Sequence, residues 1–178
     1  MFFRTRSECE ALASGYGYDC DVAHNRIVYQ QRPFPHAVTL GFSGALDRSY
    51  ALAGQIATWC GPFERLVLWV TEWSIWPSSE NLHLYYTVRR ASGDFRELAE
   101  APGHVFLKHE QADLVTFLDL TIRFGWGGFL FGYPQSAAMI LSHDEWLRVA
   151  TDGPIAPILQ SAEHFGLKVL DQTEGDPG

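Results

Sequence analysis

The chain has 178 residues, a formal net charge of −8 and a hydrophobic fraction of 47%. This length suffices for one domain with a buried core, and the apolar content excludes a disordered segment. No run approaches the roughly 20 apolar residues of a membrane helix, and no basic stretch could follow a nucleic-acid backbone.

The first half of the chain predicts alternating helices and strands. Ser7 and Glu10 match a capping box that opens a helix within residues 5–14. Residues 26–31 and 36–42 are typical of strands, with a proline-containing break between them. The next predicted elements are a helix over residues 45–60 and a buried central strand over 64–73.

The second half predicts the remaining elements of one fold. In chain order they are a helix over 77–92, a strand over 104–108, a helix over 110–125, hairpin strands over 128–133 and 137–142, a helix over 142–151 capped by Ser142, a helix over 156–166, an edge strand over 167–171 and a frayed tail over 172–178. We therefore expect a single α+β domain over residues 1–178, with four to six helices packed on a mixed, mainly antiparallel sheet.

The segment "RFGWGGFLFGYP", residues 123–134, combines four glycines with five aromatic residues. A glycine-rich loop that binds a dinucleotide follows a strand and opens a helix, whereas this segment has the reverse order. We expect Gly125 to end the preceding helix in a left-handed conformation, and Gly127 and Gly128 to turn the chain into a strand. Phe124, Trp126, Phe129 and Phe131 are then core residues, and the segment is structural.

Acidic residues are concentrated in the C-terminal part of the chain. Residues 1–108 contain ten basic and eleven acidic residues, whereas residues 109–178 contain three basic and ten acidic residues. Such a negative surface repels nucleic acid and attracts a basic protein. We expect a protein partner with a basic surface and neither a nucleic acid nor a membrane. The alternative is that the acidity only keeps the protein soluble.

Neither a metal nor a cofactor is predicted. Three cysteines without metal-like spacing are typical of the reducing cytoplasm, and the first ten residues contain no signal-peptide core. His104 and His109 flank a strand, and His143 is followed by two acids, but neither group has the spacing of a metal motif.

Ser43 is the candidate nucleophile. It lies in "LGFSGAL" between a predicted strand and a predicted helix, the position of the serine in the nucleophile elbow of hydrolases. Ala45 replaces the second glycine of that motif, and acids and histidines for a triad follow later in the chain. The alternative is that Ser43 caps the following helix.

Trp73 and Trp76 are candidate binding residues, because they stand where the central strand leaves the sheet. Exposed tryptophans at such a place anchor protein partners or stack on sugars, whereas buried ones anchor the loop.

The run "EAPGHVFLKHEQADLVTFLDLTIRFGWGGFLF", followed by "ILSHDEW", resembles sequences of small uncharacterised bacterial proteins over about a third of the chain. The size, acidity and α+β pattern are similar to those of immunity proteins that neutralise secreted bacterial toxins. This resemblance implies a protein-binding role and assigns no individual residues.

The leading hypothesis is a non-catalytic, acidic immunity-type inhibitor that neutralises a toxin. Its predicted contact residues are Asp113, Asp119, Asp144, Glu145, Trp73 and Trp76. The alternatives are a small serine hydrolase that uses Ser43 and a structural or adaptor subunit.

Overall fold

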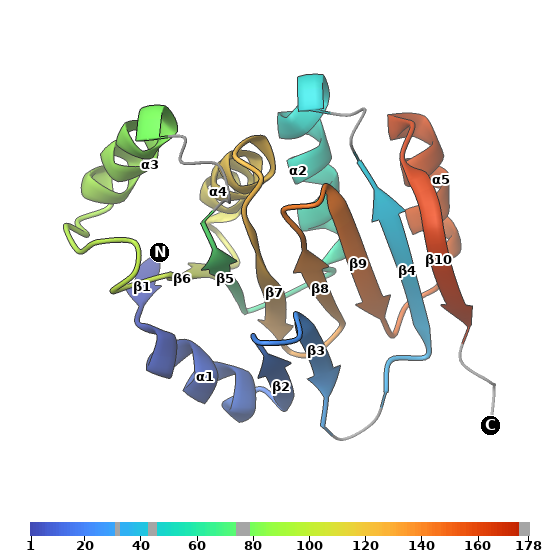
Figure 1. The fold of residues 1–178 in the computed structure, drawn as a ribbon. Helices are drawn as coiled ribbons and strands as arrows, with labels where there is room; N and C mark the ends of the chain where they lie inside the picture. The colour runs from blue at the N-terminus through green and yellow to red at the C-terminus, as the bar shows by residue number, and fades with distance from the viewer. Residues whose placement is uncertain (31–32, 43–45, 74–78, 175–178) are drawn as a thin grey trace.

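The computed structural model describes residues 1–30, 33–42, 46–73 and 79–174, and Figure 1 shows their arrangement. Eight strands form one sheet, and two form a separate hairpin. In spatial order the sheet contains β1 (Phe2–Arg4), β6 (Gly103–Leu107), β5 (Arg65–Glu72), β7 (Gly127–Tyr133), β8 (Ala137–Leu141), β9 (Trp146–Thr151), β4 (His36–Gly41) and β10 (Lys168–Glu174). The hairpin consists of β2 (Tyr18–Asp21) and β3 (Arg26–Tyr29).

Five α-helices accompany these strands in the described part of the chain. They are α1 (Arg6–Gly15), α2 (Ser49–Trp59), α3 (Ser79–Ala91), α4 (Gln111–Arg123) and α5 (Ala156–Phe165), and a short 3-10 helix (Leu46–Arg48) precedes α2. Every pair of neighbouring strands in the sheet is antiparallel. The predicted α+β class, the antiparallel character of the sheet and the number of helices are confirmed.

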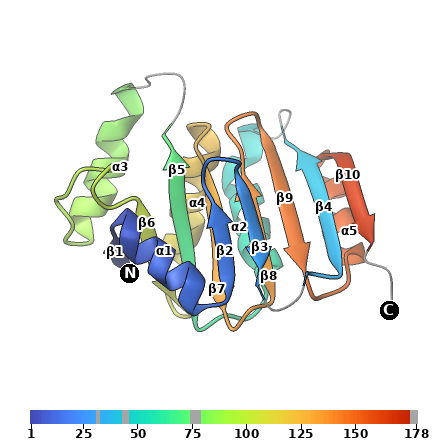
Figure 2. The ribbon, with the colours of Figure 1, turned by 60° about the horizontal axis from the view of Figure 1, so that its bottom comes forward.

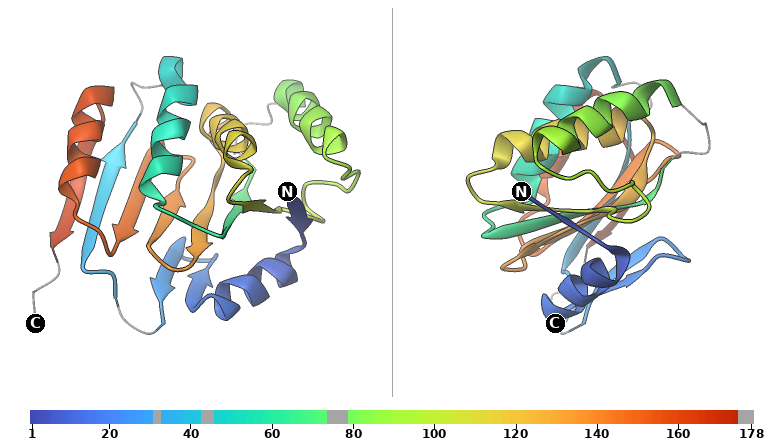
Figure 3. Two further views of the ribbon diagram at one scale, coloured as in Figure 1. Left: turned by 180° about the vertical axis from the view of Figure 1, so that it is seen from behind. Right: turned by 90° about the vertical axis from the view of Figure 1, so that its left-hand side faces the viewer.

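The sheet separates two layers, as the side view in Figure 3 shows. Helices α2 to α5 lie on one face, which we call the helix face, and α1 and the β2–β3 hairpin lie on the other, the second face. Along β5 the side chains alternate between two cores: Leu66 and Leu68 belong to the helix-face core, and Val67 and Trp69 belong to the second-face core. This double burial explains why β5 is a continuous apolar run.

The second face is covered only in part. Helix α1 and the hairpin pack over β6, β5, β7 and β8, where Val105, Trp69, Phe129 and Ile140 form a core with Tyr18. In Figure 2 nothing described lies over the same face of β9, β4 and β10. Within the described ranges, three of the eight strands therefore have an uncovered second face.

The glycine-rich segment is structural, as predicted. Gly125 follows α4 with a φ of 60°, which is the left-handed conformation. Gly127 and Gly128 lie in β7 against a bulge in β5, and a Cβ on Gly128 would stand 2.2 Å from the carbonyl oxygen of Trp69. They are glycines because two backbones approach closely. The turn lies at residues 124–125, so the prediction that Gly127 and Gly128 turn the chain is wrong.

Residues 142–151 form a turn and strand β9, so the helix predicted there is wrong. Glu145 has a left-handed backbone with a φ of 61°, and the Ser142 amide donates to the carbonyl of Trp146 at 2.9 Å. These features close a tight turn between β8 and β9. From Trp146 onward, every second residue is buried, which is the period of a strand.

Toward the two ends of the chain, one helix cap, two strands and the end of the last strand differ from the prediction. Thr5, not Ser7, caps α1, because its hydroxyl accepts from the Glu8 amide and the Glu8 carboxylate accepts from the Thr5 amide. The short strands β1 and β2 have no counterpart in the sequence prediction. Residues 172–174, predicted as part of a frayed tail, pair with β4 in β10, and residues 175–178 lie outside the described residues.

Candidate functional site

Three of the predicted contact residues lie at one end of the sheet. β5 ends at Glu72, and Trp73 follows it directly. Because β7 and β8 pair next to β5, the turn with Asp144 and Glu145 comes to the same end. We call this region the β5 end.

A histidine–carboxylate pair joins the elements of the β5 end. The Nδ1 atom of His143 lies 2.6 Å from Oε2 of Glu72, and its Nε2 atom lies 3.4 Å from Oδ1 of Asp144. The hydrogen bond with Glu72 raises the pKa of His143 above its ordinary value. Because both partners are partly exposed, this histidine can exchange protons with solvent or contact a ligand. The sequence prediction missed the pair because 71 positions separate its members.

Trp73 is anchored in the fold more firmly than an exposed binding residue would be. Its ring lies 4.9 Å from that of Trp126 and 5.5 Å from that of Tyr85, measured between centroids. Trp73 also lines a pocket of about 220 Å³ with Arg6 and Trp69. It therefore belongs to an aromatic cluster and keeps one side toward a pocket.

Two predicted residues, Ser43 and Trp76, lie outside the described residues. The strand that precedes Ser43 is described up to Phe42, whose amide donates to the carbonyl of Glu145 at 2.8 Å. The end of β4 thus contacts the turn that carries His143.

The four predicted acids do not share one surface site. Asp119 is mostly buried and accepts hydrogen bonds from Ser49 on α2 at 2.6 Å and from Arg123 at 2.9 Å. Its role is helix packing, so its prediction as a partner contact is not supported by its position. Asp113 is exposed in the first turn of α4, and only Asp144 and Glu145 are neighbours.

The uncovered part of the second face has a definite surface, which we call the open sheet face. Its residues are Thr39, Gly41, Trp146, Arg148, Leu170 and Asp171. Arg148 donates to the hydroxyl of Thr39 at 3.2 Å and lies 3.3 Å from the carboxylate of Asp171. Leu170 is 50% exposed and lies over Gly41. The open sheet face therefore combines small, apolar and paired charged side chains, and Trp146 lies at its border.

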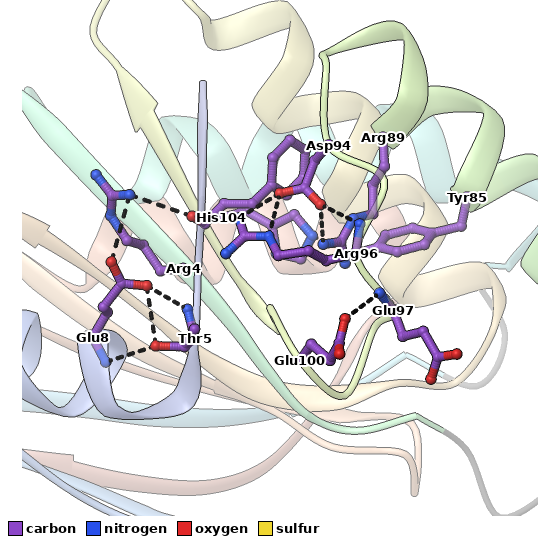
Figure 4. Close-up of polar contacts among 11 residues, drawn as sticks. Arg4, Thr5, Glu8, Tyr85, Arg89, Asp94, Arg96, Glu97, Glu100 and His104 are labelled. Atoms are coloured by element: carbon purple, nitrogen blue, oxygen red, sulfur yellow. Dashed lines mark hydrogen bonds and ion pairs between the residues drawn. The ribbon is translucent and has the colours of Figure 1, made fainter.

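A buried polar cluster stands apart from these surfaces and is shown in Figure 4. His104 and Arg89 are fully buried, and Asp94 is nearly so. His104 is bonded to the hydroxyl of Tyr85 and to the carbonyl of Leu68. Burial lowers the pKa of His104 to about 3, so its ring is neutral.

Ion pairs hold the charged half of this cluster together, although the Nε atom of Arg89 has no hydrogen-bond partner among the described residues. Arg89 donates to Asp94 at 3.1 Å, and Arg96 donates to the other carboxylate oxygen at 3.0 Å. Arg96 also bonds the carbonyl of Phe3 at 3.1 Å, and Arg89 lies over the ring of Phe3. These contacts hold the segment after α3 against strand β1, which is a structural role.

The cysteines and the acidic groups offer no obvious reactive centre. Burial raises the pKa of Cys9, Cys20 and Cys60 to about 12, so none is a thiolate nucleophile at neutral pH. Among the described residues, no three histidine, cysteine or carboxylate side chains are grouped as metal ligands.

Comparisons with protein-family models, with curated proteins and with solved structures find no match to this chain. Within the described ranges, no helix combines the length and the apolar character needed to cross a bilayer.

Proposed function

We propose that this protein is a non-catalytic protein-binding module, and that its binding surface is the open sheet face. The observation that carries the proposal is the partly covered second face: α1 and the hairpin cover β6, β5, β7 and β8, and no described residue covers β9, β4 and β10. An exposed sheet face with apolar residues is a typical protein contact surface.

The charge around the open sheet face favours a basic partner. The segments 143–154 and 168–174, which supply β9, β10 and the flanking turns, contain five acidic and two basic residues. Asp144 and Asp171 are both well exposed. Acidic groups at the rim would accelerate association with a basic surface, while Leu170 and Trp146 supply apolar contact area.

The finer form of the proposal is an immunity-type inhibitor that covers the basic active site of a toxin. The acidity of the chain and its size support it. The mechanism is steric: the bound inhibitor covers the toxin's active site, so the substrate cannot enter it.

The first test is affinity purification from the native host at low salt, followed by elution with rising salt and mass spectrometry. We expect a stoichiometric basic protein that is released as salt screens the contact. Asp171→Lys should lose this partner, whereas Glu163→Lys on α5 should retain it with the same change in net charge. A partner that Glu163→Lys loses and Asp171→Lys keeps would place the contact on the helix face and contradict the proposal.

A second candidate function is a serine hydrolase, and one observation favours it. The Glu72–His143 pair has the geometry of a base oriented by a carboxylate, and the contact between Phe42 and Glu145 brings the end of β4 to the same turn. We test it with a fluorophosphonate probe. Labelling that disappears in Ser43→Ala and persists in Ser14→Ala would favour the hydrolase, and an unlabelled native protein would reject it.

A further inference from the structure

A pocket of about 310 Å³ is lined by residues of β1, α1, β5 and β6. These elements lie at the opposite end of the sheet from β4 and β10 (Figure 1). Three aliphatic side chains from α1 and β6 line the pocket, together with the rings of Phe2 and Tyr16. Arg4 and Arg65 complete the lining. A dry cavity of about 150 Å³ holds benzene, so the space suffices for an aromatic ring with a polar substituent.

The pocket is electrostatically unlike the rest of the protein. Its two charged lining residues are both arginines, although the whole chain carries a net charge of −8. Arg65 is exposed and makes no ion pair with any described carboxylate. Arg4 lies 3.7 Å from Glu8, a contact visible in Figure 4, so its charge is only partly compensated. A concave site with this excess of positive charge attracts an anion.

Tyr16 supplies an independent indication of a ligand. Its side chain lines the pocket and is 9% exposed, and its hydroxyl has no hydrogen-bond partner among the described residues. Buried hydroxyl groups are nearly always hydrogen-bonded, because leaving one without a partner is unfavourable. The hydroxyl atom is itself buried, so the ring has to turn before this hydroxyl can meet an acceptor atom in the pocket.

We propose that this pocket binds a small aromatic carboxylate. The ring would occupy the apolar floor between Phe2 and Tyr16, and the carboxylate would face Arg65 and the hydroxyl of Tyr16. A guanidinium group matches a carboxylate in shape and can donate two parallel hydrogen bonds to it. The pocket is lined by β1, α1, β5 and β6, whereas the open sheet face is formed by β9, β4 and β10, so this ligand is independent of the protein partner proposed above.

The test is a ¹H–¹⁵N NMR titration of the full chain with benzoate and, as a neutral match, benzyl alcohol. We expect saturable shifts of the backbone amides of Tyr16, Val105 and Leu107 with benzoate, with a dissociation constant on the order of 1 mM or tighter. Benzyl alcohol should bind at least about fivefold more weakly, since it lacks the charge-assisted contact. Equal binding of the two compounds, or no saturable shift with benzoate, would overturn the proposal.

Variants show where the ligand binds, and unchanged binding of benzyl alcohol shows that a variant is still folded. Arg65→Gln should weaken benzoate binding roughly fivefold to tenfold and leave benzyl alcohol binding unchanged. Tyr16→Phe should weaken benzoate binding about twofold or more. Arg90→Gln, on the exposed side of α3, should bind benzoate like the native chain. Retained affinity in Arg65→Gln, or an equal loss in Arg90→Gln, would refute the assignment.

Discussion

His104 and His143 both hydrogen-bond to a neighbouring side chain, but their surroundings give them opposite protonation behaviour. His104 is fully buried between β5 and β6, and burial lowers its pKa to about 3. His143 lies partly exposed at the β5 end, where the hydrogen bond with Glu72 raises its pKa. The same side chain is therefore a fixed neutral part of the core in one place and a titrating surface group in the other.

The partners of the two histidines differ in the same way. The cluster around His104 pairs Arg89 with Asp94, and both side chains are removed from water. The pair of His143 with Glu72 is screened by solvent, because Glu72 is 40% exposed. Breaking a contact in the first region should affect stability strongly, and breaking one in the second should affect it little.

The largest effect is expected from Asp94→Ala. The substitution leaves Arg89 charged and buried without its carboxylate, which in buried pairs destabilises by about 3–5 kcal/mol. Urea unfolding monitored by tryptophan fluorescence measures the loss. Glu97→Ala, an exposed acid three residues along the chain, is the control and should lose less than about 0.5 kcal/mol. Similar losses in the two variants would mean that the buried cluster contributes no more than the surface does.

A smaller effect is expected from acid, through His104. Its pKa is lower in the folded protein than its ordinary value of 6.5, so below pH 6.5 the unfolded chain binds a proton that the folded chain does not. Stability should therefore fall as the pH falls through 6.5, by about 1.6 kcal/mol between pH 6.5 and 5 from this residue alone.

Two measurements isolate the contribution of His104. In histidine NMR spectra its ring signals should not titrate between pH 8 and about 5. His104→Gln should show a shallower loss of stability over this range than the native chain, whereas His109→Gln, at an exposed position, should show the native slope. A ring that titrates near pH 6.5 would show that water reaches His104.

The elements were largely predictable because each depends on local pattern. The apolar run of β5, the helical spacing within α4 and the left-handed Gly125 all follow from a few neighbouring residues. Residues 142–151 show how local pattern fails: Ser142 and the acids after it match a helix start, while the alternation from Trp146 onward indicates a strand. The two-residue alternation is the better indicator of structure here than the helix-start motif.

The sites were less predictable, because they depend on pairing across the sheet. His104 meets Tyr85 only after β6 pairs with β5 and α3 packs beside them. Glu72 meets His143 only because β7 and β8 stand between β5 and β9 in the sheet. Asp119 was predicted as a surface acid, and its burial depends on where α2 packs against α4.

The smallest effect is expected from His143→Asn, and its pH dependence should have the opposite sign to that of His104. The folded pKa of His143 is raised, so its contribution is fully present below the ordinary pKa of 6.5 and is lost as the pH rises through the folded value. Because both members of the pair are partly exposed, the contribution at pH 6 should be below about 1 kcal/mol. We would compare the native chain, His143→Asn and the control His109→Asn at pH 6 and pH 8.5. The difference between native and His143→Asn should be present at pH 6, shrink at pH 8.5, and shrink also in high salt, which screens exposed pairs. A difference that persists unchanged at pH 8.5 would mean that His143 stabilises the turn by packing and not by its charge.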